Sequence, residues 1–358
     1  MAIAALAACG TAAASEDYDL RYAPGIGGAD MSAPFEGGWV FQAPVYVYSG
    51  NIRTTSTITT PFSTIHAINP AVPAIPGAYT LTTVNANTQI NVYGLLPRLS
   101  YMSSATFLGA TVGATLLLPL VNKKNNSRVT GVSTVGVSPL PALNNAAIAA
   151  AINPLAAGQA AGIANGNSNA DFGTGDPEIS PILRWSTEAT QTLFILTAVA
   201  PLGDYDPSRA ANPSAGKFWT FRPAVQFSYI GDGWDMGIRG AFSYNTRNTE
   251  THYKTGNYVN VDFTLMKSVS DSTRVGIAAY GVDQTTRDNR TAVPTDPVMK
   301  ARQDVTVDQK GHVAGVGPEI AYIHGAGDYL IDGRIMKEFS AVTRPKGFTA
   351  VVTLSKPF

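Results

Sequence analysis

The sequence has little of the material that disulfide-rich, nucleic-acid-binding and helical membrane proteins need. Its one cysteine, Cys9, lies near the start, so the folded body has no disulfide and no thiol chemistry. Charged residues make up 14%, and 25 basic residues balance 25 acidic ones, which leaves no field to attract nucleic acid. No unbroken run of about 20 apolar residues follows the first dozen positions, so a transmembrane helix has no candidate.

Apolar residues are nevertheless plentiful, and they occur in short pieces. They make up 45% of the chain, and the mean hydropathy of +0.04 is high for a soluble protein but far too low for a helical membrane protein. A transmembrane β-barrel distributes its apolar residues in this way, because each strand shows one face to lipid and the other to the lumen. We therefore predict an all-β protein of the outer-membrane barrel type.

Segments of period two that are long enough to cross a membrane, about 9 to 11 residues each, number about twelve. They begin near Trp39, Thr88, Thr106, Glu178, Gln191, Trp219, Trp234, Asn257, Arg274, His312, Tyr329 and Gly347. Short connections lie around Ser103 and at 186–190, 231–233, 268–272 and 325–328. Long ones lie at 49–87, 122–176, 202–217, 246–256 and 284–311, with a brief last one at 342–346. This alternation predicts a twelve-stranded antiparallel transmembrane β-barrel with periplasmic turns, extracellular loops and both termini in the periplasm.

The two faces of the predicted strands also indicate a transmembrane β-barrel. The segment from Trp219 places aromatic and apolar residues on one face and Arg222 on the other, and the segment from Trp234 does the same with Arg239. An arginine that faces lipid at mid-depth costs about 2 to 4 kcal/mol, so both should point into the lumen. The last segment alternates in the same way and stops on Phe358, which resembles the assembly signal of outer-membrane barrels.

Three segments are expected along the chain. Residues 1–15 resemble the remnant of a secretory signal without its basic start, because small apolar residues end in Ala12, Ala13 and Ala14. A lipoprotein cleavage box at Cys9 is the alternative. Residues 16–37 are glycine-rich without a period and lie either in the periplasm or inside the lumen as a plug. Residues 38–358 form the barrel, with a loop helix at 142–152 that Asn153 and Pro154 stop, followed by a small and polar stretch at 158–169.

An ordered series of residues covers about half the chain: Gly173, Gly175, Asp176, Pro181, Pro201, Gly203, Tyr205, Asp206, Asn212, Trp219, Pro223, Phe227, Ser228, Tyr229, Asn245, Asn248, Tyr253, Gly256, Val275, Gly276, Tyr280, Gln284, Asp288, Gly317, Pro318 and Tyr322. The series resembles the outer-membrane channel family labelled as a putative MetA pathway of phenol degradation. The resemblance implies a barrel channel for the uptake of small, often aromatic or hydrophobic, molecules.

Catalytic and metal chemistry have little support in the sequence. The four histidines, His66, His252, His312 and His324, fall in expected loops, turns and strand ends, and none has a readable serine and carboxylate beside it. Asp283 and Asp288 are either calcium ligands or, as is more common, solvated loop charges. We predict no enzyme, no metal and no cofactor.

Reading each strand in register places ten polar side chains in the lumen: Glu178, Arg184, Arg222, Gln226, Arg239, Asp262, Glu319, Asp332, Arg334 and Glu338. They either hold the barrel interior together as opposite charges or line a constriction that admits neutral and zwitterionic solutes. Phe62, Tyr79, Phe172 and Tyr253 are candidate substrate contacts in the loops, unless they pack the loops together. A hydrophobic solute gains nothing by crossing a wet, charged lumen. It would need a dry groove under the loops or a lateral exit near Pro97, Pro119 or Pro181, where proline removes a ladder donor.

These features together predict a monomeric channel of a bacterial outer membrane that passes small, hydrophobic or aromatic solutes. Its expected partners are outer-membrane lipid, lipopolysaccharide and the solutes themselves. Two alternatives stay open, a general pore for small solutes and ions, and a barrel that conducts nothing and serves structure or adhesion.

Overall fold

The computed structural model describes residues 15–32, 37–68, 70, 73–137, 146–325 and 327–358. Two short helices, η1 (Glu16–Tyr18) and η2 (Ala29–Met31), precede the strands. The strands are β1 (Gly38–Pro61), β2 (Tyr79–Leu95), β3 (Arg98–Phe107), β4 (Ala110–Leu117), β5 (Leu120–Val137), β6 (Asn169–Thr174), β7 (Glu178–Ser186), β8 (Thr190–Val199), β9 (Thr220–Gly231), β10 (Trp234–Asn245), β11 (Tyr253–Lys254), β12 (Tyr258–Ser268), β13 (Thr273–Gln284), β14 (Asn289–Arg290), β15 (His312–His324), β16 (Tyr329–Val342) and β17 (Lys346–Pro357). Three helices lie in the connections: α1 (Phe62–Ile68), α2 (Ala146–Gly166) and α3 (Pro297–Asp304).

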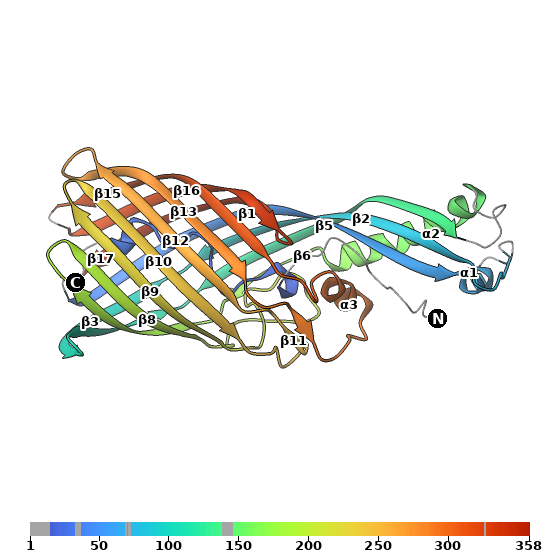
Figure 1. Ribbon diagram of the computed structural model, residues 1–358, viewed down its shortest axis with the longest axis horizontal. Helices are drawn as coiled ribbons and strands as arrows, with labels where there is room; N and C mark the ends of the chain where they lie inside the picture. Colours follow the sequence, from blue (N-terminus) through green and yellow to red (C-terminus); the bar gives the residue numbers. More distant parts are fainter. Residues whose placement is uncertain (1–14, 33–36, 69, 71–72, 138–145, 326) are drawn as a thin grey trace.

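Twelve strands within the described residues close into an antiparallel barrel (Figure 1): β1, β3, β4, β7, β8, β9, β10, β12, β13, β15, β16 and β17. Closure comes from β17, which pairs with β1 from Val40↔Pro357 to Asn51↔Lys346. Every neighbouring pair is antiparallel, so each backbone N–H and C=O in the wall finds a partner without an exposed edge. The predicted twelve-stranded outer-membrane barrel is confirmed.

The outer face of the barrel is apolar, as the period of two requires. Trp219, directly before β9, and Phe221 and Val225 on β9 are exposed, whereas Arg222 and Gln226 on the same strand are buried inside. Trp39 and Tyr101 pack with ring centroids 4.7 Å apart at the end where the short turns lie. Helices of the described residues are all too short or too polar to span a membrane. The exposed aromatic and apolar side chains form the outer face of the wall, and the polar side chains lie in the lumen.

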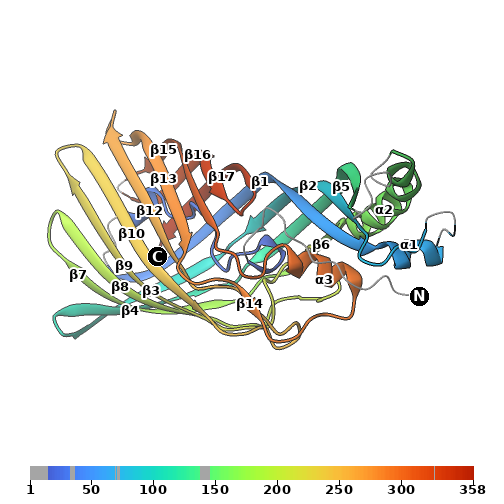
Figure 2. The same cartoon turned by 45° about the vertical axis from the view of Figure 1, so that its right-hand side comes forward.

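Three strands continue well past the barrel mouth (Figures 1 and 2). β1 pairs with β2 from Val45↔Leu95 to Pro61↔Tyr79, and β2 pairs in turn with β5, forming a sheet that projects beyond the other strands. The predicted long loops 49–87 and 122–176 are therefore wrong over much of their length. The threonines at 54, 55, 57, 59 and 60 are β-branched, and β2 pairs with this whole stretch of β1, so the polar stretch remains a strand beyond the barrel wall.

Two further expectations need correction. The first short turn lies at Leu108 and Gly109, with φ of 51° and 75°, and not at Ser103, because that turn requires a positive φ at both positions. The loop helix does not stop at Asn153 and Pro154 but extends through Pro154 to Gly166, which also makes the stretch from Gly158 helical. Proline removes only one helical N–H bond, and packing of α2 on β5 offsets that loss.

The topology makes a labelling prediction. Ser56 on projecting β1 and the exposed Asn165 and Thr295 all lie on the side of the long connections. Single cysteines at these positions should react with an impermeant maleimide on whole cells, because that side faces outward. A cysteine at Asp271 in a short turn is the matched control and should react only after lysis. Labelling in the opposite order would reverse the orientation.

Candidate functional site

The segment from Ser15 to Ser32 lies inside the barrel and contacts its wall through backbone groups. Arg334 on β16 donates from Nε to the Gly25 carbonyl at 3.0 Å and from Nη2 to the Ile26 carbonyl at 2.5 Å. Gln226 on β9 donates to the Met31 carbonyl at 2.9 Å. Since the segment forms no strand, its carbonyls depend on these side chains for their hydrogen bonds.

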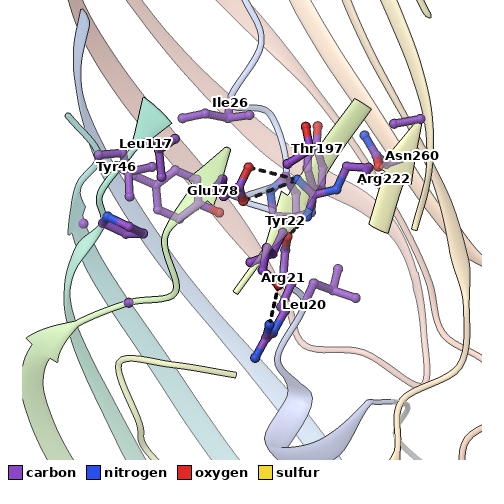
Figure 3. Close-up of a pocket in the computed structure, with 18 of the residues that line it drawn as sticks. Leu20, Arg21, Tyr22, Ile26, Tyr46, Leu117, Glu178, Thr197, Arg222 and Asn260 are labelled. Carbon is purple, nitrogen blue, oxygen red and sulfur yellow. Dashed lines mark hydrogen bonds and ion pairs between the residues drawn. The ribbon is translucent and has the colours of Figure 1, made fainter. Parts of the chain in front are cut away.

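Charges bind the same segment to the wall. Asp30 pairs with Arg98 at 3.4 Å, Arg21 with Asp176 at 3.1 Å and Lys123 with Asp19 at 2.6 Å. Wall residues also pair with each other. Arg239 lies 2.7 Å from Asp262, which also accepts a hydrogen bond from Tyr22. Arg222 lies 3.2 Å from Glu178 and donates to the Arg21 carbonyl (Figure 3).

The structure places all ten predicted lumen residues on the inner side of the wall. Six of them line the main cavity: Glu178, Arg184, Arg222, Gln226, Arg239 and Glu338. The other four are buried by the N-terminal segment and its neighbours: Asp262, Glu319, Asp332 and Arg334. Arg334 contacts Asp332 and lies 3.7 Å from Glu319, and all three side chains are fully buried. Most of these charged side chains therefore pair with one another or with the N-terminal segment.

A cavity of about 360 Å³ remains between the segment and the opposite wall. On that wall five apolar side chains line the cavity, Leu117 from β4, Ile182 from β7, and Leu193, Ile195 and Val199 from β8, and polar side chains such as Glu178, Arg184 and Thr197 lie between them (Figure 3 shows Leu117 beside Tyr46). We call this side of the lumen, on β4, β7 and β8, the apolar half because of these five apolar side chains, although polar side chains also lie on it. We call the opposite side, on β9 to β16, the polar half; its Gln226 and Arg334 hydrogen-bond to the N-terminal segment.

The sequence contained a signal for the apolar half that our reading by period missed. On β8, Leu193 and Ile195 face the cavity while Phe194 and Leu196 are exposed outward. The result is an unbroken apolar run, Leu193–Leu196, where a strand beside a wet lumen would alternate. The run therefore marks an apolar patch on the inner face of β8, between the inward-facing Gln191 and Thr197.

Arg184 differs from the other lumen arginines. Its side chain is 8% exposed and lines the cavity near the periplasmic end of β7, opposite Thr111 and Leu193. Within the described part of the chain it makes no hydrogen bond or ion pair, and its Nε is buried without an acceptor. It is therefore a cation directed into the cavity with its donors unused.

The extracellular end of the segment is covered by loops. The Glu16 carboxylate accepts hydrogen bonds from Asn248 at 3.1 Å, Thr251 at 3.0 Å and Gln303 at 3.0 Å. Burial raises the pKa of Glu16 to about 7, the neighbouring Asp17 charge acts in the same direction, and the hydrogen bonds oppose them. The loops therefore hold a carboxyl that titrates near neutral pH.

This loop contact should weaken as pH rises. The folded pKa of Glu16 exceeds its ordinary value of 4.5, so the stabilisation is complete below about 4.5 and is lost as pH rises through about 7. Trypsin cleavage after Arg302, beside this contact, should become at least about tenfold faster between pH 6 and pH 8 relative to a Glu16→Gln variant, which cannot ionise. Equal pH profiles for the two proteins would contradict this assignment.

The four loop aromatics do not gather at one place. Phe62 is fully buried with Ile65, Ala78 and Ile152 in the projecting part, and Tyr253 is fully buried and donates to Asp288 at 2.7 Å. Phe172 on β6 is exposed, and Tyr79 is half-buried at the far end of β2. None of the four lines the main cavity, so the packing alternative describes Phe62 and Tyr253.

Prolines interrupt the wall beside the apolar half. At Pro44, Pro97, Pro119 and Pro177 adjoining strands change their pairing partners. One backbone hydrogen bond spans each of these interruptions, such as the bond from Leu96 N to Pro44 O at 2.9 Å and the bond from Leu118 N to Pro97 O at 3.0 Å. The prediction named Pro97 and Pro119 but placed the third interruption at Pro181. Pro181 is paired with Ala114 of β4 and leaves a gap only in the β7–β8 ladder.

The closed barrel, the apolar belt and the cavity define an outer-membrane channel protein. The chain belongs to the family described as putative MetA-pathway of phenol degradation, whose model matches residues 75–354. No curated protein matches the sequence.

Solved structures of outer-membrane proteins are similar to this chain to different degrees. An outer membrane channel from Pseudomonas putida F1 superposes with a TM-score of 0.56 at 12% identity, over 91% of this chain and 98% of that one. The CymD monoaromatic hydrocarbon channel gives 0.40 at 9% identity over 94% of each chain. A Pseudomonas aeruginosa FadL homologue gives 0.36 at 10% identity over 91% of each chain. The first of these superpositions shows that the chain has the fold of an outer-membrane barrel, which places the protein in the bacterial outer membrane.

Proposed function

We propose that the protein is a passive channel that carries small hydrophobic or aromatic compounds across the outer membrane. The observation that carries the proposal is the apolar half of the lumen, where Leu117, Ile182 and Ile195 line a cavity of about 360 Å³. Such a cavity accepts an apolar solute because it removes apolar surface from water. The family's description, which refers to phenol degradation, agrees with this class of solute.

The N-terminal segment, residues 16–32 of the described chain, acts in this proposal as a plug. It hydrogen-bonds to β9 and β16, and its ion pairs neutralise Arg98, Asp176 and Lys123, which would otherwise attract hydrated ions. Polar solutes therefore meet a constricted passage in which most charges are paired, whereas apolar solutes contact the apolar side chains of β4, β7 and β8. The protein performs no chemistry on its solute, works as a monomer, and presents its aromatic outer face to lipid and lipopolysaccharide.

Whole cells with an intact lipopolysaccharide layer provide the test, since that layer slows hydrophobic solutes. A deletion strain should take up labelled phenol several-fold more slowly than its parent at limiting concentration, while uptake of a labelled sugar of similar size stays unchanged. The plasmid-borne gene should restore phenol uptake. If the deletion slows only the sugar, the protein is a general small-solute pore, and if it slows neither, the barrel conducts nothing relevant.

A further inference from the structure

A buried carboxylate lies at the start of the described chain. The Asp288 side chain is fully buried and accepts hydrogen bonds from Gly256 N at 2.6 Å, Gln284 Nε2 at 2.6 Å and Tyr253 Oη at 2.7 Å. Its fourth donor is the backbone nitrogen of Ser15. No lysine, arginine or histidine of the described residues forms an ion pair with it. Burial raises its pKa to about 6, which shows that neutral donors alone compensate the charge incompletely.

The residues before this nitrogen carry a processing signal. Ala12 and Ala14 stand three residues and one residue before Ser15, which is the small-residue pattern at which a secretory signal is removed. The carboxylate and the cleavage pattern point to the same atom, the Ser15 nitrogen. They are independent observations, because one comes from the fold of loops 246–256 and 285–311 and the other from the chain itself.

We propose that a secretory signal peptidase cuts the Ala14–Ser15 bond and that the new α-ammonium group forms an ion pair with Asp288. In the hydrolysis, water adds to the Ala14 carbonyl carbon, the C–N bond breaks, and the Ser15 nitrogen keeps the electron pair and takes up protons. The products are the Ala14 carboxylate and the Ser15 ammonium. Capture of a chain's N-terminal amine by buried acceptors is a known mode of recognition.

Other contacts make Ser15 suited to this role. Its residue is fully buried, its Oγ accepts from Arg344 Nη1 at 2.9 Å, and Arg344 Nη2 donates to the Tyr18 carbonyl at 2.9 Å. The turn between β16 and β17 thus positions the same end of the segment that Asp288 binds. Before cleavage the nitrogen is a neutral amide, so the ion pair forms only in the processed chain and holds the segment inside the barrel.

The test begins with the mass of the mature protein purified from outer membranes, which should correspond to a start at Ser15. Two variants then disrupt the ion pair, one at each partner. Asp288→Asn removes the charge of the carboxylate, and insertion of one glycine between Ala14 and Ser15 displaces the ammonium group and leaves the barrel residues unchanged. Each should raise hydrogen exchange of residues 16–31 by at least about a hundredfold, and the combination should add little more. Asp283→Asn, which alters an exposed carboxylate paired with His312, is the matched control and should change nothing.

Three results would overturn the proposal. A lipid-modified start at Cys9, or a start at any residue other than Ser15, removes the ammonium from the site. Exchange that responds to Asp288→Asn but not to the glycine insertion means that Asp288 serves only its neutral donors. Fully additive effects of the two changes show that they act on different interactions.

A different observation supports a second inference, which rests on the proposed function. Arg184 is buried, unpaired among the described residues and directed into the cavity beside Leu193 and Ile182. We infer that Arg184 binds the carboxylate of an amphipathic solute whose apolar body lies on these side chains. A guanidinium binds a carboxylate with two parallel hydrogen bonds, and the low polarity around it strengthens them.

Uptake of labelled benzoate and labelled phenol in whole cells separates this inference from the proposed function. Arg184→Met should lower benzoate uptake about tenfold and leave phenol uptake unchanged, and Arg184→Lys should restore part of the loss. Equal losses for both solutes, or no loss for benzoate, would overturn the role of Arg184. Failure of the wild-type gene to raise uptake of either solute would overturn the proposed function itself.

Discussion

Replacing Arg334 by methionine is expected to release the N-terminal segment and to raise single-channel conductance several-fold. The substitution removes the donors to the Gly25 and Ile26 carbonyls and leaves Asp332 and Glu319 buried without their cation. Breaking a buried ion pair from one side costs about 3 to 5 kcal/mol, most of which would be relieved if the segment left and water entered. Planar-bilayer recording of the purified protein measures the change.

A matched control variant distinguishes an effect on the N-terminal segment from an effect on the stability of the barrel. Arg274 on β13 pairs with buried Asp235 on β10, and within the described residues neither side chain forms a hydrogen bond or ion pair with the N-terminal segment. Arg274→Met should therefore lower barrel stability without changing conductance. If Arg334→Met gives a heat-resistant barrel of wild-type conductance, the segment does not control the current. If it prevents folding, Arg239→Met, which removes one partner of Asp262 beside Tyr22, gives the second test.

Replacing Ile195 by aspartate should lower aromatic uptake at least about tenfold, because a charge in the apolar wall must keep its water and displaces an apolar solute. Ile195 lies on β8 midway along the apolar half of the lumen. Initial rates of labelled phenol uptake in the complemented deletion strain measure the effect. The expected loss is in transport alone, since the side chain faces the cavity and not lipid.

Two controls belong to this prediction. Ile195→Leu keeps volume and polarity and should keep wild-type uptake. Gln191→Glu adds a negative charge on the same face of the same strand, toward its periplasmic end, and should leave phenol uptake nearly unchanged. Equal uptake by Ile195→Asp and the wild type would mean that the solute does not cross this cavity. The solute would then follow another route, and the interruptions of the wall at Pro97 and Pro119 would be the next region to test.

Much of the wall could be predicted from the sequence because a membrane imposes strict local rules. Each strand of β9 and β10 has one face for lipid and one for the lumen, so the period of two alone places Arg222 and Arg239 inside. The projecting sheet was not predicted because its threonines and asparagines lie outside the membrane, where strands need not alternate between a lipid face and a lumen face. Polar residues there are compatible with a loop or a strand, and only pairing of β1, β2 and β5 decides between them.

The sequence by itself determined the number of wall strands, their orientation and which side chains face inward, since all three follow from local periodicity and connection length. Only the tertiary structure decided how the lumen charges are used. Asp30, Arg21 and Asp19 of the N-terminal segment meet Arg98, Asp176 and Lys123 across separations that no local pattern encodes. These long-range ion pairs, together with the hydrogen bonds from Gln226 and Arg334, hold the segment in the lumen and leave the cavity beside it, because a charge that leaves water must find its partner wherever the closed barrel places one.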